Sequence, residues 1–196
     1  VYKRQARRTP CFRAVRRAVN RTAGEALQFA RYAVSRDNDR EESPREHEMS
    51  LHIAVMGAGC IGSWVGSRLV AAGVRVTLIG RQRLIQDAHD GGIHATSVRG
   101  EQVSVSAAQI QVTTRPEMVE DADFVMICVK GRDTIAAAEA IAPHLHSQAV
   151  VVSLQNGLTN PDRLRMVLPH HLVVAGMIPF NVVWTHQSPG IHVVQA

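Results

Sequence analysis

The sequence predicts an α/β protein built around a doubly wound, mainly parallel β-sheet, and three observations lead to this fold class. Apolar stretches of strand length alternate with stretches of helix length from residue 51 onward. Two of the apolar stretches, FVMICVK (124–130) and AVVVSLQNG (149–157), are continuous, as is typical of parallel strands buried on both faces. A glycine-rich turn joins the first apolar stretch to the first helix. Strands that alternate with helices favour a parallel sheet covered by helices.

The glycine-rich turn lies in the segment LHIAVMGAGCIGSWVGSRLVAAGVRVTLIGR, which occupies residues 51–81. Its glycines form the pattern G-x-G-x-x-G where a strand gives way to a helix, the context in which this pattern predicts a Rossmann-like, dinucleotide-binding fold. Gly57 is expected to permit the tight turn, Gly59 to let a pyrophosphate approach the backbone, and Gly62 to let the helix pack on the strand. The amides at the helix N-terminus attract phosphate. The alternative is an ordinary tight strand-to-helix turn. The expected cofactor contacts here are Gly57, Ala58, Gly59, Cys60, Ile61 and Gly62.

The positive charge of the chain belongs to its first fifty residues. The formal net charge is +5; residues 1–50 contain 12 Lys and Arg against 7 Asp and Glu, whereas residues 51–196 contain 10 of each. The first methionine is Met49. We therefore expect a disordered or non-native basic extension over 1–48 and one Rossmann dinucleotide-binding domain over 49–196. A transit peptide and a nucleic-acid-binding arm are the alternatives for the extension.

Cysteine and histidine usage gives no sign of a disulfide framework or a metal site. Cys11, Cys60 and Cys128 are far apart and odd in number, so we expect a reducing, cytoplasmic compartment. The histidine pairs 144/146 and 170/171 lack carboxylate or cysteine partners at a useful spacing, and we expect them to be solvated. No apolar run is long enough to span a bilayer. We expect neither a membrane nor a nucleic-acid partner, and the sequence carries no signal for an oligomeric state.

The remaining elements follow from periodicity and from turn residues. Between residues 93 and 113, apolar and polar residues alternate around Arg99-Gly100, which predicts short antiparallel strands or a hairpin. Trp184 and His186 are expected in a loop near the carboxyl edge of the sheet, where they would border the substrate cleft; the alternative is an ordinary surface loop. Helices are expected at 81–90, at 134–145 with Asp133 as its cap, and at 161–168, and further strands at 171–180 and 191–196.

Ligands of doubly wound sheets bind beyond the carboxyl ends of the strands, so the residues at the strand ends decide the cofactor. The second strand ends at Gly80-Arg81, and no carboxylate is present there to bind ribose hydroxyls. The guanidinium of Arg81 suits a phosphate, so we expect NADPH rather than NADH. The alternative is a solvent-facing arginine in a loop.

Two polar residues follow the next two predicted strands. Lys130 ends one buried strand and Asn156 ends the other, and both are expected opposite the glycine turn. A charge at the end of a buried strand needs an anion or a polar ligand, and an amide both donates and accepts hydrogen bonds. We expect the two residues to contact the nicotinamide ribose or the substrate. The alternatives are a lysine that extends to solvent and an ordinary Asn-Gly turn.

The segments GAGCIG, IGR, CVKGRDT, SLQNG and SPGIHVV together resemble the ketopantoate reductase (2-dehydropantoate 2-reductase) family. The resemblance begins near Met49 and runs to the end of the chain. It implies NADPH-dependent reduction of 2-dehydropantoate to pantoate, a step toward pantothenate and coenzyme A. It also implies that Arg81 binds the 2′-phosphate, that Lys130 and Asn156 line the nicotinamide-ribose and substrate side, and, by a looser alignment, that Val182 lies near the cofactor.

The resemblance also implies a second, helical domain that contains the family's proton-donor lysine. This domain is absent before Ala196, so we expect no catalytic residue within the chain. We expect the cofactor-binding half of a truncated enzyme that binds NADPH and turns over little substrate. Two alternatives are an NADPH-dependent reductase of another 2-keto acid and a non-catalytic NADPH-binding module.

Overall fold

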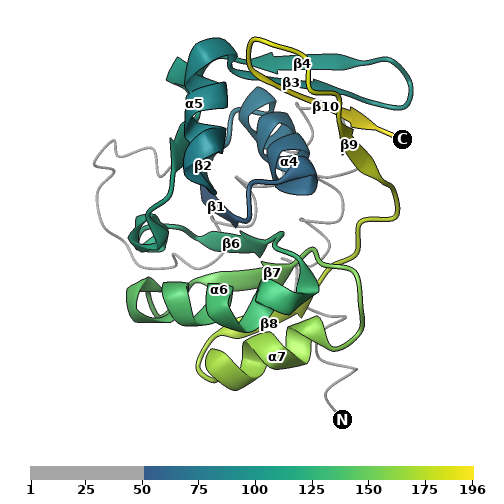
Figure 1. The fold of residues 1–196 in the computed structure, drawn as a ribbon. Helices are drawn as coiled ribbons and strands as arrows, with labels where there is room; N and C mark the ends of the chain where they lie inside the picture. The colour runs from purple at the N-terminus through teal and green to yellow at the C-terminus, as the bar shows by residue number, and fades with distance from the viewer. Residues whose placement is uncertain (1–50) are drawn as a thin grey trace, which may run out of the picture.

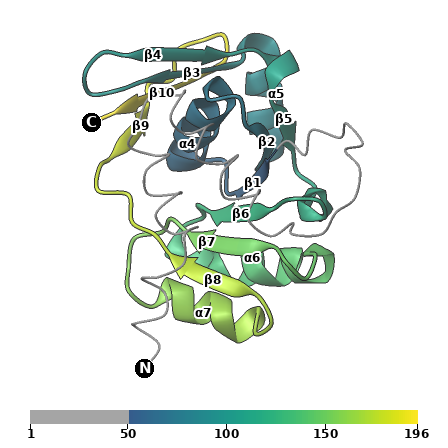
Figure 2. The same cartoon turned by 180° about the vertical axis from the view of Figure 1, so that it is seen from behind.

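The computed structural model describes residues 51–196, and the predictions for 1–48 lie outside the described residues. Figure 1 shows a six-stranded sheet and a smaller four-stranded sheet with helix α4 between them, and Figure 2 shows the same arrangement from behind. Helices α6 and α7 cover the other face of the large sheet. The helices are α4 (Cys60–Ala71), α5 (Gln82–Gly91), α6 (Thr134–Ile141) and α7 (Asn160–Val167).

The large sheet has the strand order β5-β2-β1-β6-β7-β8, and every neighbouring pair is parallel. Its strands are β1 (His52–Met56), β2 (Arg75–Ile79), β5 (Gln111–Thr113), β6 (Phe124–Ile127), β7 (Val150–Ser153) and β8 (Leu172–Ala175). Counted along the large sheet alone, this is the order 3-2-1-4-5-6 of the doubly wound dinucleotide-binding fold. The predicted fold class is therefore confirmed. The order reverses between β1 and β6, so the ligand crevice is expected at their carboxyl ends.

Successive residues of each central strand enter two separate cores. Ile53 and Val55 of β1 face α4, whereas Ala54 faces α6 and α7. The same alternation places Met126 of β6 in the α4 core and Val125 in the α6–α7 core. Because both faces are buried, these strands need apolar residues at every position, which explains the continuous apolar stretches of the sequence.

The small sheet was not predicted. It has the order β4-β3-β10-β9, from β3 (Ile93–Thr96), β4 (Gln102–Val105), β9 (Val182–Trp184) and β10 (Ile191–Gln195). The β3–β4 hairpin is antiparallel, as predicted, and turns at Gly100, whose φ is +80°. Strand β10 then pairs in parallel with β3 and antiparallel with β9. The buried side chains of this sheet join the core around α4.

Three local predictions were wrong. Residues 111–113 are not part of the hairpin: a short 3₁₀ turn at Ala107–Gln109 separates them from β4, and they add β5 in parallel to β2. Trp184 lies on β9 rather than in a loop, because β10 supplies it with a partner strand. The strand expected at 171–180 ends at Ala175.

The helix boundaries differ less from their predictions. Helix α6 ends at Ile141, and Pro143 lies in a following 3₁₀ turn. Asp133 is the N-cap residue of α6, but its side chain makes no capping hydrogen bond. Within residues 51–196, no helix has both the length and the apolar character needed to cross a membrane.

Candidate functional site

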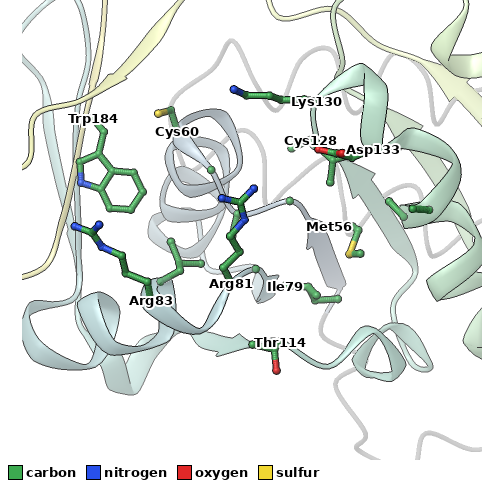
Figure 3. Close-up of a pocket in the computed structure, with 18 of the residues that line it drawn as sticks. Met56, Cys60, Ile79, Arg81, Arg83, Thr114, Cys128, Lys130, Asp133 and Trp184 are labelled. Carbon is green, nitrogen blue, oxygen red and sulfur yellow. The ribbon is translucent and has the colours of Figure 1, made fainter.

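A cleft of about 880 Å³ opens at the carboxyl edge of the large sheet (Figure 3). It is lined by the glycine turn, by the segments that follow β2, β5 and β6, by the start of α6, and by β9 with the residues after it. The lining residues are 56–60, 79–81, 83–84, 114, 128–130, 132–133, 136–137, 184 and 186. The cleft thus lies where a doubly wound sheet binds its ligand.

The glycines of the turn have different surroundings. Gly57 has a φ of +103°, and its amide donates to the Ile79 carbonyl at 3.0 Å. A Cβ on Gly62 would collide with the Gly57 carbonyl oxygen, so the third glycine lets the helix pack on the turn. A Cβ on Gly59 would meet no atom of the described residues within 4 Å. The middle glycine therefore faces open space, as an approach by a pyrophosphate requires.

The N-terminus of α4 offers hydrogen-bond donors to this space. The first hydrogen bond into the helix runs from the Ser63 amide to the Gly59 carbonyl at 2.8 Å. The amides of Cys60, Ile61 and Gly62 precede that bond, and no side chain of the described residues caps them. The first turn of α4 contains no acidic residue. Unpaired amides and the helix dipole together make this end of the helix suitable for an anion.

Two arginines follow β2 at one end of the cleft. Arg81 is the N-cap residue of α5, but its side chain makes no capping hydrogen bond. Its guanidinium points into the cleft in Figure 3. Arg83 lies two residues further on with its side chain 85% exposed, and its Nε is 3.6 Å from Asp87 Oδ2. Both guanidinium groups are thus available to a ligand phosphate.

Lys130 lies in the turn after β6, at the other end of the cleft. The prediction that it ends a buried strand was wrong: β6 ends at Ile127 and Lys130 is exposed. Its turn is held by the buried side chain of Gln155, whose Nε2 donates to the Val129 carbonyl at 2.9 Å and to Thr134 Oγ1 at 2.8 Å. This tether fixes the backbone from which Lys130 reaches the cleft.

The lining of the cleft is strongly cationic. Arg81, Arg83, Lys130 and Arg132 contribute four positive charges, and Asp133 contributes the one carboxylate among the described lining residues. Asp133 lies 3.6 Å from the Nε of Arg132. Excess positive charge around unpaired amides favours a ligand with several phosphates. No group of three or more His, Cys, Asp or Glu residues within 51–196 has a geometry that could hold a metal ion.

Some predicted site residues lie outside the cleft lining. Ile61 and Gly62 lie in the first turn of α4 behind the lining residues. Asn156 is exposed in the loop after β7, which ends at Ser153, so its predicted place at a strand end was wrong. Its carbonyl accepts a 2.7 Å hydrogen bond from Asn160 Nδ2. Val182 packs on the core around α4 from β9, two residues before Trp184.

Both cysteines of the cleft are partly exposed. Cys60 is partly exposed at the start of α4. Burial raises the pKa of the Cys128 thiol to about 12, because the thiolate would lose its hydration. Cys128 lines the cleft as a neutral thiol and is not a nucleophile at neutral pH.

Sequence reasoning missed several lining residues. Arg83 follows Arg81 by two positions in the sequence. The direction of its side chain depends on where α5 begins, which the sequence alone does not determine. Thr114 was missed because β5 had been assigned to the hairpin. Arg132 and Asp133 follow Lys130 by two and three residues and were not assigned to the site. Trp184 and His186 were not missed: they were expected at the border of the cleft and both line it, although Trp184 does so from β9 rather than from a loop.

The comparisons with known proteins agree with this geometry. The model of the family described as "Ketopantoate reductase PanE/ApbA" matches residues 53–195. A 2-dehydropantoate 2-reductase of Halobacterium salinarum is 32% identical over 142 residues, which are 72% of this chain and 45% of the relative. One of Pyrococcus abyssi is 35% identical over 115 residues, 58% of this chain and 36% of the relative.

Solved structures show the same likeness. A PanE/ApbA family ketopantoate reductase from Ralstonia eutropha JMP134 superposes with a TM-score of 0.61 and 33% identity, over 74% of this chain and 46% of that chain. D-mandelate dehydrogenase, in a ternary structure with NADH and anilino(oxo)acetate, gives a TM-score of 0.58 and 25% identity over 74% of this chain and 45% of that chain. The chain spans less than half the length of these relatives. Since the family match extends over most of its length, the chain belongs to the ketopantoate reductase family.

Proposed function

We propose that this chain is the NADPH-binding part of a 2-dehydropantoate 2-reductase, which forms pantoate on the way to pantothenate and coenzyme A. The observation that carries the proposal is the cleft in which the open face of Gly59, the unpaired amides of α4 and the guanidinium of Arg81 meet. NADPH, when bound, supplies the hydride that reduces the ketone. The chain's own residues bind and orient it.

Within this proposal, Arg81 selects NADPH by contacting the 2′-phosphate. The contact is supported by its place at the end of β2 and by the lack of a carboxylate beside it in the described lining. A charge-assisted hydrogen bond contributes about 1.5–3 kcal/mol. We therefore expect NADPH to bind roughly ten- to a hundredfold more tightly than NADH.

At the other end of the cleft, Lys130 faces the nicotinamide ribose and the substrate. Its ammonium group would attract the carboxylate of a 2-keto acid and hold the ketone near the cofactor. Asn156 lies exposed on the neighbouring loop and is proposed to contribute its amide from there. Ile61 and Gly62 are assigned to the cofactor site through their amides, and Val182 as the support of Trp184.

The test of cofactor choice is a titration of the purified chain with NADPH and with NADH. Arg81→Asp should reduce the affinity ratio between the two cofactors to about one, because the phosphate contact is replaced by repulsion. Arg99→Asp, an equal charge change at an exposed position in the β3–β4 turn, is the control and should leave the ratio unchanged. A wild-type ratio that survives in Arg81→Asp would refute the assignment.

A second candidate function is reduction of another 2-keto acid. It is favoured by the likeness to D-mandelate dehydrogenase, whose structure contains the 2-oxo acid anilino(oxo)acetate. Binding of 2-dehydropantoate and of anilino(oxo)acetate to the NADPH complex can be compared through the fluorescence of the reduced nicotinamide. Tighter binding of 2-dehydropantoate supports the first proposal, and tighter binding of the aryl compound supports the second. Binding of neither, with NADPH bound, would favour a non-catalytic NADPH-binding module.

The proposal includes a cytoplasmic location and a small 2-keto acid as the partner. Cys60 and Cys128 are free thiols, which suits a reducing compartment. Residues 51–196 are formally neutral, so we propose no nucleic-acid partner for this part of the chain.

A further inference from the structure

Trp184 and His186 form an aromatic wall along one side of the cleft. Their rings are nearly parallel, with an interplanar angle of 17° and centroids 6.2 Å apart. Trp184 is half-buried on β9, and His186 follows in the exposed segment after it. Both residues line the same cleft as the glycine turn. No part of the cofactor has been assigned to either ring above.

The backbone at the aromatic wall adopts an uncommon conformation. His186 has a φ of +55°, and it is the one residue other than glycine with a positive φ within the described part of the chain. Such a conformation is unfavourable for a residue with a Cβ, and its occurrence at the edge of a cleft is a reason to look for a function. The conformation places the imidazole beside the indole.

The wall lies at the β2 side of the cleft. In the view of Figure 3, Trp184 and Arg83 are drawn on the same side of Cys60 and Lys130 on the other side, and all three line the cleft. Strands β2 and β6 flank β1 in the large sheet. A dinucleotide whose pyrophosphate sits on the turn after β1 therefore has one half over β2 and the other over β6. The proposed contact between Arg81 and the 2′-phosphate places the adenosine half of the cofactor on the β2 side.

The other tryptophan shows that Trp184 is not simply a core residue. Trp64 of α4 is 6% exposed and packs edge-on against Phe180, 5.0 Å between ring centroids, inside the core of the small sheet. Trp184 contacts the margin of that core and also lines the cleft. Its partial exposure costs hydrophobic free energy that a flat aromatic ligand would recover.

We propose that Trp184, supported by His186 and joined by Arg83, forms the binding site for the adenine ring of the cofactor. This inference rests on the proposed function, which supplies the dinucleotide. The face of a purine stacks on an indole, and a guanidinium stacks on the exposed purine face. The one ion pair of Arg83 among the described residues is the exposed 3.6 Å contact with Asp87, so the guanidinium can turn toward the base.

The test uses the full chain and two fragments of the cofactor. Adenosine 2′,5′-bisphosphate contains the adenine and the 2′-phosphate, whereas reduced nicotinamide mononucleotide contains neither. In calorimetric titrations, Trp184→Leu should weaken binding of the adenosine fragment about tenfold and leave the nicotinamide fragment unchanged. Trp184→Phe, which keeps a flat aromatic face, should stay within about threefold of the wild type. Val183→Ala, on the neighbouring exposed position of β9, is the control.

Arg83→Met gives a second measurement that does not depend on the packing of β9. It should weaken binding of the adenosine fragment about threefold or more, whereas Arg99→Met should have no effect on this binding. Unchanged binding of the adenosine fragment by Trp184→Leu, or an equal loss for both fragments, would overturn the adenine assignment. If the wild type binds the adenosine fragment and Trp184→Leu binds it equally well, the proposed function stands and this inference alone fails. A wild-type chain that binds neither fragment would instead refute the proposed function.

Discussion

The two sheets of this chain contribute to the cleft in different ways. The large sheet supplies the glycine turn and the segments that hold Arg81 and Lys130, and its strands are buried on both faces between α4 and the α6–α7 layer. The small sheet covers α4 from the outside and supplies Trp184 and the segment of His186. The large sheet thus provides the phosphate-binding framework, and the small sheet provides one wall of the cleft.

This difference shows how local and long-range order combine in one site. The parallel strands are marked by continuous apolar stretches that a single segment reveals. The small sheet exists only because β10 returns to pair with β3, about a hundred residues earlier in the chain, with Ile191 beside Ile93. A residue such as Trp184 therefore reaches the ligand through pairings that no local pattern encodes.

The largest effect of a substitution on stability and on NADPH binding is expected at the glycine turn after β1. Gly62→Val places a branched side chain against the Gly57 carbonyl, which should destabilise the protein by about 3 kcal/mol or more and abolish NADPH binding. Gly59→Ala is the matched variant, since its Cβ meets no described atom within 4 Å. It should keep the melting temperature of the wild type and weaken NADPH binding. Equal stability of Gly62→Val and the wild type would contradict the close packing of α4 on the turn.

A smaller effect on stability is expected for a substitution in the small sheet. Val193 on β10 is fully buried in the core around α4, and Val193→Ala should lower the free energy of unfolding by about 2 kcal/mol. Because this core is shared by both sheets, urea unfolding should remain a single transition with an unchanged slope. Val183→Ala on the exposed face of β9 should have little effect. Two separate transitions in Val193→Ala would show that the small sheet unfolds independently.

The smallest effect is expected at the amino edge of the large sheet, far from the cleft. Burial opposes the ionisation of Asp121, but its 2.6 Å hydrogen bond from Arg75 and the charges of His52 and Arg75 together lower its pKa below the usual 3.8. Since the pKa is lowered in the folded state, the contribution to stability is present above about pH 4 and is lost as the pH falls through the folded-state pKa. The carboxylate is 55% exposed, so solvent screening limits this contribution to less than about 1 kcal/mol.

Asp121→Asn checks this pH dependence. Near pH 6 the variant should be slightly less stable than the wild type, and the difference should shrink below about pH 4, where the carboxylate of the wild type becomes protonated. Asp162→Asn removes a comparable exposed ion pair, with Arg165 on α7, and is the control for a general charge effect. A difference between Asp121→Asn and the wild type that grows as the pH falls would have the wrong sign for this account.

The sequence alone was sufficient to predict the glycine turn and the strand-end residues of the cleft. It was not sufficient to predict the strands β5 and β9 that complete the lining. The pattern of Gly57, Gly59 and Gly62 between an apolar strand and a helix is local, and it located the turn correctly. Arg81 and Lys130 follow strands recognisable from their apolar stretches, and the structure brings both into the cleft. The predicted place of Asn156 depended on where β7 ends, and strand ends are set by pairing with neighbours rather than by the residues themselves. The positions of Thr114 and Trp184 depended on strands β5 and β9, whose partners lie far away in the sequence.

The central claim is that the turn after β1 and the first turn of α4 bind the pyrophosphate of NADPH. Amide hydrogen exchange, followed by mass spectrometry with and without NADPH, tests this most directly. We predict that NADPH slows exchange across residues 57–63, in which the unpaired amides of residues 60–62 would donate to the phosphates. Exchange in residues 160–167 of α7, on the far side of the large sheet, should remain unchanged. Exchange across 57–63 that remains unchanged at saturating NADPH would contradict the account.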